Sequence, residues 1–360
     1  MAVPLFASNH ERYLPLLQQR MAEVIASGRY ILGPEVEAFE REFADYLGAR
    51  HCIGVANGTD AITLALRALG VEPGDEVVLP SFTFYATAEA AVNAGATPVF
   101  CDIDPGTFCV TRETVERAIT PRTKAIVAVH LFGNVAPVPD LMELGLPVLE
   151  DSAQAAGATL DGRKAGSLGS AATYSFFPSK NLYCLGDGGA VITNDDEVAE
   201  RVKRLRFHGS EDKVTFVDVG YNSRLDELQA AALRVLLPEL DGWNAARRAA
   251  AAAYEQQGLG DVVSLPRPVA GADPVHHLYV VRSPEADSLA RELEGRDVGV
   301  RAYYRVPVHL QPAMERWGGP GLDLPGTEVA ARENLAFPMG SELSPEAISE
   351  VVNACRGALV

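Results

Sequence analysis

The chain of 360 residues is long enough for two domains, and its 48% hydrophobic and 22% charged residues are typical of a globular protein. Its 48 acidic and 31 basic side chains give a formal net charge of −17, which excludes nucleic acid and anionic membranes as main partners. No apolar run approaches the roughly 20 residues of a spanning helix, and the segment MAVPLFASNHERY lacks a basic stretch followed by an apolar one, so a cytoplasmic protein is expected. Five scattered cysteines without a CxxC pair indicate neither a disulfide framework nor a zinc site.

Short apolar segments alternate with segments of helical periodicity over the first two thirds of the chain. The segments of strand type span 52–55, 76–79, 97–100, 125–131, 147–150, 172–176 and 189–193. The helical segments span 13–27, 35–47, 61–69, 87–94, 111–119, 197–207 and 225–236. This alternation predicts an α/β fold whose large domain has a mostly parallel sheet wound by helices on both faces. Ligands of such sheets bind beyond the carboxyl ends of the strands, so the residues there are the candidates for a site.

The first candidate is the turn Gly58-Thr59, which follows the strand 52–55 and opens a helix. A Gly-Thr pair at a helix N-terminus offers free backbone N–H groups, a hydroxyl and the positive end of the helix dipole, which together suit a phosphate. A plain N-cap explains the same residues. On this motif alone both interpretations stay open.

Asp151 follows the apolar strand 147–150 in a neighbourhood of few polar residues. A buried carboxylate is costly unless a cation or hydrogen-bond donors accompany it, and a protonated pyridine nitrogen is one such partner. The alternative is an N-cap for the segment that begins at Ser152.

Lys180 lies in the stretch YSFFPSKNLYCL, between aromatic residues and the glycine-rich segment LGDGG. Most lysines are solvated surface charges. A partly desolvated lysine loses some preference for its charged form, however, and its neutral amine can form a Schiff base with a carbonyl. Ser175 ends the preceding strand and has a hydroxyl for a phosphate. The stretch therefore indicates a reactive amine beside an anion site.

The pattern changes towards the C-terminus. The helical segments 225–236 and 244–254 predict a bridge to a smaller α+β domain. Its predicted strands span 277–281 and 300–304, and its predicted helices span 286–293 and 345–355. The predicted domains are residues 1–240, which bind the cofactor, and residues 241–360.

These features converge on one cofactor, pyridoxal 5′-phosphate. Its phosphate needs donors, which Gly58-Thr59 and Ser175 supply, and its ring needs a stacking partner, which is Phe84. Asp151 supplies an anion for the pyridinium nitrogen, and Lys180 supplies an amine for the aldehyde.

With these motifs the sequence closely resembles the DegT/DnrJ/EryC1/StrS family of sugar aminotransferases, which has the type I aspartate aminotransferase fold. The segments that carry the resemblance are YILGPEVEAFEREFA, NGTDA, SFTFYATAEA, LEDSAQAAGA, SFFPSKNL, GDGGAV, GYNSRLDELQAA and PVHLQP. They span nearly the whole chain, and a series of motifs in this order is highly specific for the family.

The resemblance implies a function for each site residue. Lys180 would form the Schiff base and then move the proton between Cα of the substrate and C4′ of the cofactor, while Asp151 would keep the pyridinium protonated. Gln154 would lie near the 3′-oxygen, and Phe84 would stack on the ring. The implied phosphate ligands are Gly58, Thr59, Ser175 and, from the neighbouring subunit, Asn222. A homodimer with shared active sites is therefore implied.

Within the family, the segments GYNSRLDELQAA and PVHLQP look most like those of enzymes that act on dTDP-keto-6-deoxysugars at C3. Two departures fall where substrate would approach: Tyr303-Tyr304-Arg305 replaces a usual His-Tyr-Pro, and Tyr183-Cys184 replaces small residues. The candidate substrate contacts are Tyr183, Tyr304 and His309, with Arg224 for the carboxylate of the amino donor. The alternatives are a histidine buried in a domain interface for His309 and packing at a helix N-terminus for Arg224.

The expected reaction is a ping-pong transfer of an amino group from an amino acid, L-glutamate in first place, to a nucleotide-linked deoxysugar, dTDP-3-keto-6-deoxyhexose. The alternatives are amination at C4 or of a keto-inositol, a pyridoxal-phosphate-dependent sugar dehydratase, and a non-catalytic regulator that senses a sugar or the cofactor. Dehydratases of this fold usually carry histidine in place of the lysine, and a regulator would be expected to lose the lysine or the acid. Lys180 and Asp151 therefore count against both.

Overall fold

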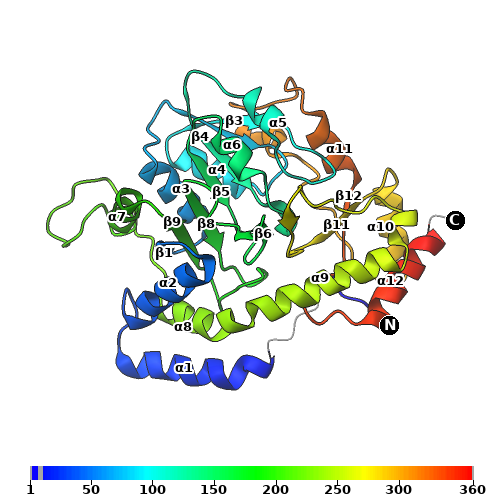
Figure 1. Cartoon of the computed structure of the whole chain (residues 1–360), viewed down its shortest axis with the longest axis horizontal. Coiled ribbons are helices and arrows are strands. Elements are labelled where there is room, and N and C mark those ends of the chain that lie inside the picture. Colours follow the sequence, from blue (N-terminus) through cyan, green and yellow to red (C-terminus); the bar gives the residue numbers. More distant parts are fainter. Residues whose placement is uncertain (1, 7–10, 359–360) are drawn as a thin grey trace.

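A seven-stranded sheet forms the centre of the larger part of the protein, whose computed structural model describes residues 2–6 and 11–358 (Figure 1). In hydrogen-bonded order its strands are β1 (His51–Val55), β9 (Gly189–Thr193), β8 (Ala171–Ser175), β5 (Val148–Asp151), β4 (Thr123–Val129), β2 (Glu76–Pro80) and β3 (Thr97–Cys101). Strand β9 is antiparallel to both of its neighbours, and the other pairs are parallel. The predicted mostly parallel sheet is confirmed.

Helices cover both faces of this sheet, as predicted (Figure 1). On one face α3 (Gly58–Ala68) packs on β8 and β9, and it also contacts α4 (Ala86–Asn93) and α7 (Asp196–Leu205). On the other face α2 (Pro34–Leu47) and α8 (Glu227–Leu236) enclose Tyr174 and Phe176, and α1 (Leu14–Ser27) lies on α8. Two short helices, α5 (Arg112–Glu116) and α6 (Val138–Met142), complete the larger part.

The smaller part is built on α9 (Leu240–Gln256), which runs from α8 to α12 (Pro345–Ala358) (Figure 1). Beside it lie the antiparallel pair β11 (Tyr279–Arg282) and β12 (Asn334–Phe337), with α10 (Ala286–Glu294) and α11 (Pro325–Glu333). A three-stranded sheet of β10 (Ala272–Asp273), β6 (Thr159–Leu160) and β7 (Arg163–Lys164) connects the two parts. Single turns of 3-10 helix span Glu11–Tyr13, Leu131–Gly133, Leu237–Glu239, Leu259–Asp261, Val308–Leu310 and Pro312–Met314.

The N-terminal residues pack on the smaller part, where Val3 bridges to Val298 and Phe6 to Met339. The division into 1–240 and 241–360 stays a prediction. Within residues 2–6 and 11–358, no helix has the length and apolar composition needed to cross a membrane.

The predicted strand at 300–304 is wrong. Only Arg301 pairs, in a single bridge to Ala336, and Tyr304 adopts a left-handed backbone with φ 55° that cannot continue a strand. The aromatic and β-branched residues of this segment resemble a strand, but they form a turn instead. The true partner of β11 is β12, whose four residues follow directly after a helix and gave little period-two signal.

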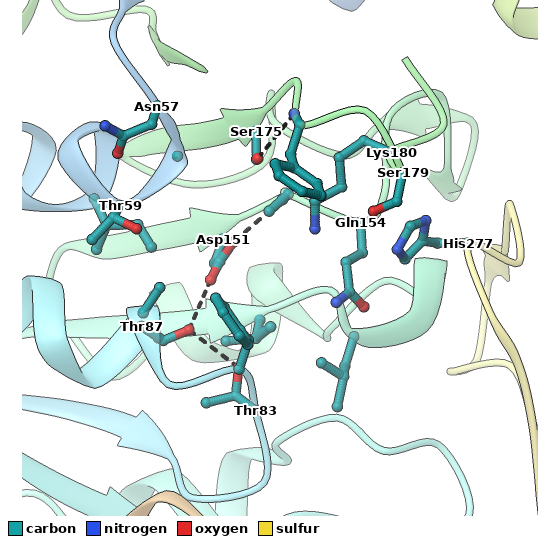
Figure 2. Close-up of a pocket in the computed structure, with 18 of the residues that line it drawn as sticks. Asn57, Thr59, Thr83, Thr87, Asp151, Gln154, Ser175, Ser179, Lys180 and His277 are labelled. Atoms are coloured by element: carbon teal, nitrogen blue, oxygen red, sulfur yellow. Dashed lines mark hydrogen bonds between the residues drawn. The ribbon is translucent and has the colours of Figure 1, made fainter. Parts of the chain in front are cut away.

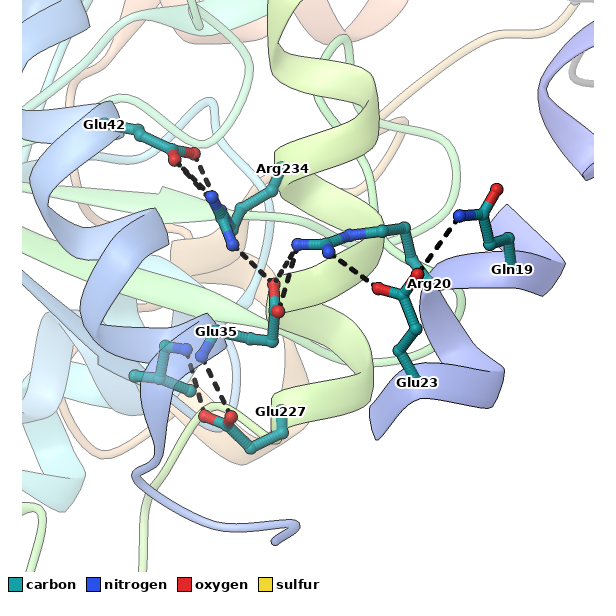
Figure 3. A network of polar contacts seen from close by, with 8 residues as sticks. Gln19, Arg20, Glu23, Glu35, Glu42, Glu227 and Arg234 are labelled. Atoms are coloured by element: carbon teal, nitrogen blue, oxygen red, sulfur yellow. Dashed lines mark hydrogen bonds and ion pairs between the residues drawn. The ribbon is translucent and has the colours of Figure 1, made fainter. Parts of the chain in front are cut away.

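Charged side chains join α1, α2 and α8 on the outer surface (Figure 3). Arg234 of α8 donates from Nε to both carboxylate oxygens of Glu42 at 3.0 Å and from Nη1 to Glu35 at 2.8 Å. Glu35 also accepts from Arg20 of α1 at 3.0 Å. These side chains are partly exposed, so each pair contributes only about 0–1 kcal/mol.

Glu227, the first residue of α8, has a different function in the same region (Figure 3). Its side chain is buried and accepts the backbone N–H groups of Gly33, Glu35 and Val36 at 2.8, 2.9 and 3.0 Å. These are donors at the N-terminus of α2 that have no acceptor inside the helix. A Cβ on Gly33 would lie 2.8 Å from the Glu227 carboxylate, so a side chain there would displace the carboxylate from these N–H groups.

We expect Glu227→Ala to destabilise the fold by about 3 kcal/mol, because it leaves several buried N–H groups without an acceptor. The matched control, Arg20→Ala, removes a partly exposed charge from the same region and should cost less than about 1 kcal/mol. Urea unfolding followed by circular dichroism measures both. Equal destabilisation by the two variants would contradict the proposed importance of the cap.

Candidate active site

A single cavity of about 640 Å³ gathers the residues beyond the carboxyl ends of the parallel strands (Figure 2). The predicted cofactor residues that line it are Gly58, Thr59, Phe84, Asp151, Gln154, Ser175 and Lys180. The parallel strands β1, β2, β5 and β8 end at the same edge of the sheet, which is why residues so distant in sequence meet there.

One end of the cavity is formed by the N-terminus of α3. Asn57 caps this helix, because its Oδ1 accepts the N–H of Asp60 at 2.8 Å. The N–H groups of Gly58 and Thr59 lie in the first turn, where no intrahelical acceptor exists, and both residues line the cavity. A Cβ on Gly58 would lie 2.7 Å from that of Ser175, so glycine is needed to bring the Ser175 hydroxyl to the helix end. This group of donors at a positive helix end fits a phosphate.

Asp151 ends β5 with its carboxyl group buried against the cavity (Figure 2). Its oxygens accept the hydroxyl of Thr87 at 2.9 Å and the N–H of Ala153 at 3.2 Å. A turn and no helix follows it, so the alternative of an N-cap is wrong. Burial raises the pKa of Asp151, although Thr87, Ala153 and the nearby Lys180 oppose the shift. A cation brought into the cavity would therefore complete its environment, as a pyridinium nitrogen does.

A pair of threonines supports this carboxylate. Thr87 belongs to the first turn of α4, and its Oγ1 also lies 3.1 Å from Oγ1 of Thr83 (Figure 2). Neither residue is assigned to the site from the sequence, although Thr83 lies in the segment 82–85 just past a predicted strand. The signal was available, since the two threonines stand four residues apart just beyond the carboxyl end of β2.

Lys180 follows β8 after a short turn in which its N–H donates to the carbonyl of Phe177 at 2.8 Å. Burial lowers the pKa of the amine to about 8, against the opposing effect of Asp151. At pH 7 about one such amine in ten is neutral, far more than for a lysine in water. The side chain is therefore suited to act as a nucleophile.

Gln154 has a fixed orientation. Its Oε1 accepts the N–H of Phe132 at 2.6 Å, so its Nε2 is the donor that faces the hydroxyl of Tyr304 at 3.3 Å and the cavity. Tyr304 stacks on the Phe132 ring with 6.0 Å between centroids. Phe84 also lines the cavity, and 58% of its surface is exposed. Its ring is therefore accessible to an aromatic ligand that stacks on it.

Three predicted substrate contacts lie elsewhere. His309 is 1% exposed, and its Nδ1 lies 2.5 Å from the hydroxyl of Ser81, so it is too buried to contact a substrate and the interface alternative is correct. Tyr183 points away from the cavity and stacks on Trp243 at 5.9 Å. The guanidinium of Arg224 lies 6.0 Å from the centre of the Phe207 ring.

Asn222 is exposed and does not line the cavity of its own chain. It bridges to Phe207 at the base of the loop that follows α7. A contact of Asn222 with a phosphate therefore requires a second copy of the chain, and stays a prediction.

The cavity also has walls that the sequence did not reveal. These are formed by Phe6, Asp60, Glu89, Asn93, Ser179, Asp187, His277 and Tyr303, besides Thr83 and Thr87. Among the described residues, Lys180 is the one lysine or arginine that lines the cavity, while Asp60, Glu89 and Asp187 surround it with negative charge. His277 and Phe6 come from sequence segments without a motif, so only folding brings them to the site.

We expect Thr87→Val to weaken the binding of pyridoxal phosphate about 10- to 100-fold, because it removes a hydrogen bond to an ionised carboxylate without changing the volume. Absorbance titration of the cofactor-free protein measures this affinity. Thr83→Val, the control, touches Asp151 only through Thr87 and should change the affinity much less. Unchanged affinity in Thr87→Val would show that Thr87 does not support Asp151.

Comparison with known proteins agrees with this geometry. A pleiotropic regulatory protein of Geobacillus stearothermophilus is 46% identical over 98% of this chain and 97% of its own length. A dTDP-3-amino-3,4,6-trideoxy-alpha-D-glucose transaminase of Streptomyces venezuelae is 46% identical over 93% of this chain and 90% of its own. The crystal structure of S. venezuelae DesV in complex with a ketimine intermediate superposes with a TM-score of 0.95, 44% identity, and coverage of 99% and 98% of the two chains.

The model of the DegT/DnrJ/EryC1/StrS aminotransferase family matches residues 15–356. Members of this family use pyridoxal phosphate, and solved relatives hold its aminated form. The predicted cofactor and the predicted resemblance are both confirmed, with the phosphate donors, the buried acid and the amine in one cavity. The chain belongs to the DegT/DnrJ/EryC1/StrS family of pyridoxal-phosphate-dependent aminotransferases.

Proposed function

We propose that this protein moves an amino group from an amino acid, L-glutamate in first place, to the keto group at C3 of a nucleotide-linked deoxysugar of the dTDP-3-keto-6-deoxyhexose type. The observation that carries the proposal is one cavity lined by the amine of Lys180, the carboxylate of Asp151 and the donors of Gly58, Thr59 and Ser175 that fit a phosphate. The names of similar transaminases that act on dTDP-3-amino sugars support the choice of sugar and of position.

When bound, pyridoxal phosphate supplies an aldehyde for the Schiff base and a ring that accepts an electron pair from the substrate. The residues of this chain supply the rest. Lys180, whose pKa burial lowers to about 8, would provide the neutral amine and carry the proton to and from carbon. Asp151 would favour a proton on the ring nitrogen by its negative charge, and the hydroxyl of Thr87 orients that carboxylate.

The first alternative is a regulator, because the Geobacillus relative is named a regulatory protein. A regulator has no need for a lysine of lowered pKa facing a buried acid, and this chain retains both. The dehydratase alternative is disfavoured by Lys180 itself. Amination at C4, and of a keto-inositol, remain as alternative substrates that an assay can separate.

A homodimer is part of the proposal. The cavity has acidic residues at Asp60, Glu89 and Asp187, which would repel the diphosphate of a nucleotide sugar unless other groups neutralise it. The loop that follows α7 projects from the body of the protein and exposes apolar side chains, namely Val214, Phe216, Val217 and Val219 (Figure 1). Such a loop fits a role in covering the cavity of a second copy and bringing Asn222 to it. Action in the cytoplasm is proposed with it.

The reaction can be tested on protein loaded with aminated cofactor. We expect a dTDP-3-keto-6-deoxysugar to restore the aldehyde absorbance, and Lys180→Ala to lower turnover with glutamate by at least about 10²–10⁴-fold. Lys203→Ala, on the surface of α7, is the matched control and should keep the parent rate. Parent turnover in Lys180→Ala would refute the mechanism, and a response to an inositol ketone alone would refute the substrate class.

Sharing of sites can be tested with two defective variants. If Asn222 of the partner subunit serves each site, then a heterodimer of Lys180→Ala and Asn222→Ala chains contains one intact site. Refolding the two variants together should then restore about a quarter of the parent activity at cofactor concentrations that leave Asn222→Ala empty. Absence of any recovery in verified heterodimers would mean that Asn222 acts within its own chain or not at all.

A further inference from the structure

A chain of buried polar side chains leads from α9 to the wall of the cavity. It consists of Asn244, Asn181 and His277, which are 0%, 4% and 5% exposed. Asn181 Nδ2 donates to Asn244 Oδ1 at 2.9 Å, and Asn181 Oδ1 lies 3.1 Å from His277 Nδ1. His277 lines the cavity, and Asn181 is the residue next to Lys180.

Two backbone carbonyls fix the orientation of the two asparagine amides in this row of hydrogen-bonded side chains. Asn244 Nδ2 donates to the carbonyl of Ala156 at 2.8 Å, so its Oδ1 must face Asn181. Asn181 Nδ2 donates to the carbonyl of Val275 at 3.2 Å, so its Oδ1 must face His277. A carbonyl oxygen can only accept, and therefore neither amide can be reversed without losing a buried hydrogen bond.

The consequence for His277 is a single tautomer. Its Nδ1 faces an acceptor and must carry the proton, which leaves Nε2 with a lone pair. Burial, Lys180 and the buried guanidinium of Arg247 hold the pKa of His277 well below its usual value, so the ring stays neutral. Within residues 2–6 and 11–358, no donor bonds to Nε2.

Lys180 is the complementary group. Its ammonium is near enough to lower the pKa of His277, and both side chains face the same cavity (Figure 2). In the described part of the chain, its Nζ has neither a hydrogen bond nor an ion pair. A donor and an acceptor that lack protein partners thus line the same cavity, where a direct hydrogen bond would satisfy both.

We propose that Nε2 of His277 is a fixed hydrogen-bond acceptor for the amine of Lys180, and that Asn181 and Asn244 are positioning residues that hold it in this state. This hydrogen bond would fix the position of the Lys180 amine within the cavity whenever the amine is not covalently bound to a ligand. The inference deepens the proposed function, on which its purpose rests, by assigning a positioning residue to the reacting amine.

The amine of Lys180 in the cofactor-free protein provides a direct measurement. The chain has only five lysines, so the modification of Lys180 by reductive methylation can be followed by peptide mass spectrometry as a function of pH. The titratable groups that line the cavity with the amine are Asp60, Glu89, Asp151, Asp187, His277, Tyr303 and Tyr304, with Arg247 behind His277. An acceptor for the ammonium form raises the pKa of the amine, and its loss lowers it.

Two substitutions separate an acceptor from a packing residue. His277→Gln places an amide oxygen near the position of Nε2 but loses the donor to Asn181, whereas His277→Asn keeps that donor and has no atom near Nε2. We expect His277→Asn to lower the pKa of Lys180 by about one unit, which makes the neutral amine about tenfold more abundant at pH 6. We expect His277→Gln to keep the pKa within about 0.3 units of the parent.

The proposal would be overturned if the pKa of Lys180 shifted in the opposite pattern, if it shifted equally in both variants, or if it shifted in neither. The unsubstituted protein offers a second measurement, because ring ¹⁵N chemical shifts report the tautomer. We expect His277 to carry its proton on Nδ1 from pH 6 to 9, and a proton on Nε2 in that range would also overturn the proposal. Neither measurement needs turnover, so a failure of the proposed transamination is distinguishable from a failure of this inference.

Discussion

Burying a carboxylate within reach of an amine at the end of β5 is the constraint around which the cavity is organised. Strand β5 has two consecutive carboxylates, which face opposite sides of the sheet. The protein stabilises each of them in a different way. Glu150 is 0% exposed and accepts from the N–H groups of Gly166, Leu168 and Gly169 and from His130. Asp151 has only one hydroxyl and one N–H group. The first carboxylate is satisfied and structural, and the second is left ready for a cation.

The same contrast between satisfied and unsatisfied groups runs through the rest of the cavity. Asn181 and Gln154 have their carbonyl oxygens engaged by the protein, so the orientation of each amide is set before a ligand arrives. In the described part of the chain, the amine of Lys180 and Nε2 of His277 are among the polar atoms of this cavity that have no protein partner. Preorganised polar groups of this kind interact with a ligand without the cost of reorientation.

Two departures from the usual family pattern, Tyr183 and Arg305, pack against the protein, whereas Tyr303 lines the cavity. Tyr183 stacks on Trp243 of α9, whose indole N–H donates to Tyr13 at 3.2 Å. Arg305 donates to the carbonyls of Ala331 and Arg332 at the end of α11 and pairs with Asp287 of α10 at 2.6 Å. Neither side chain enters the cavity. The contacts of Arg305 on the outer side thus stabilise the turn at Tyr304, whose ring lines the cavity.

The sequence by itself determined the class of the fold, the cofactor and seven residues of one chain that line the cavity, namely Gly58, Thr59, Phe84, Asp151, Gln154, Ser175 and Lys180. It could do so because each lies just beyond a strand, in a motif whose spacing is set by the strand–turn–helix unit. His309, Tyr183 and Arg224 do not line the cavity of their own chain, because proximity in sequence to a substrate segment does not say which way a side chain points. The tertiary structure decided that the Thr87 hydroxyl donates to Asp151 and that His277 lines the same cavity as Lys180. Those contacts join segments far apart in the chain, and long-range packing rather than local periodicity sets them.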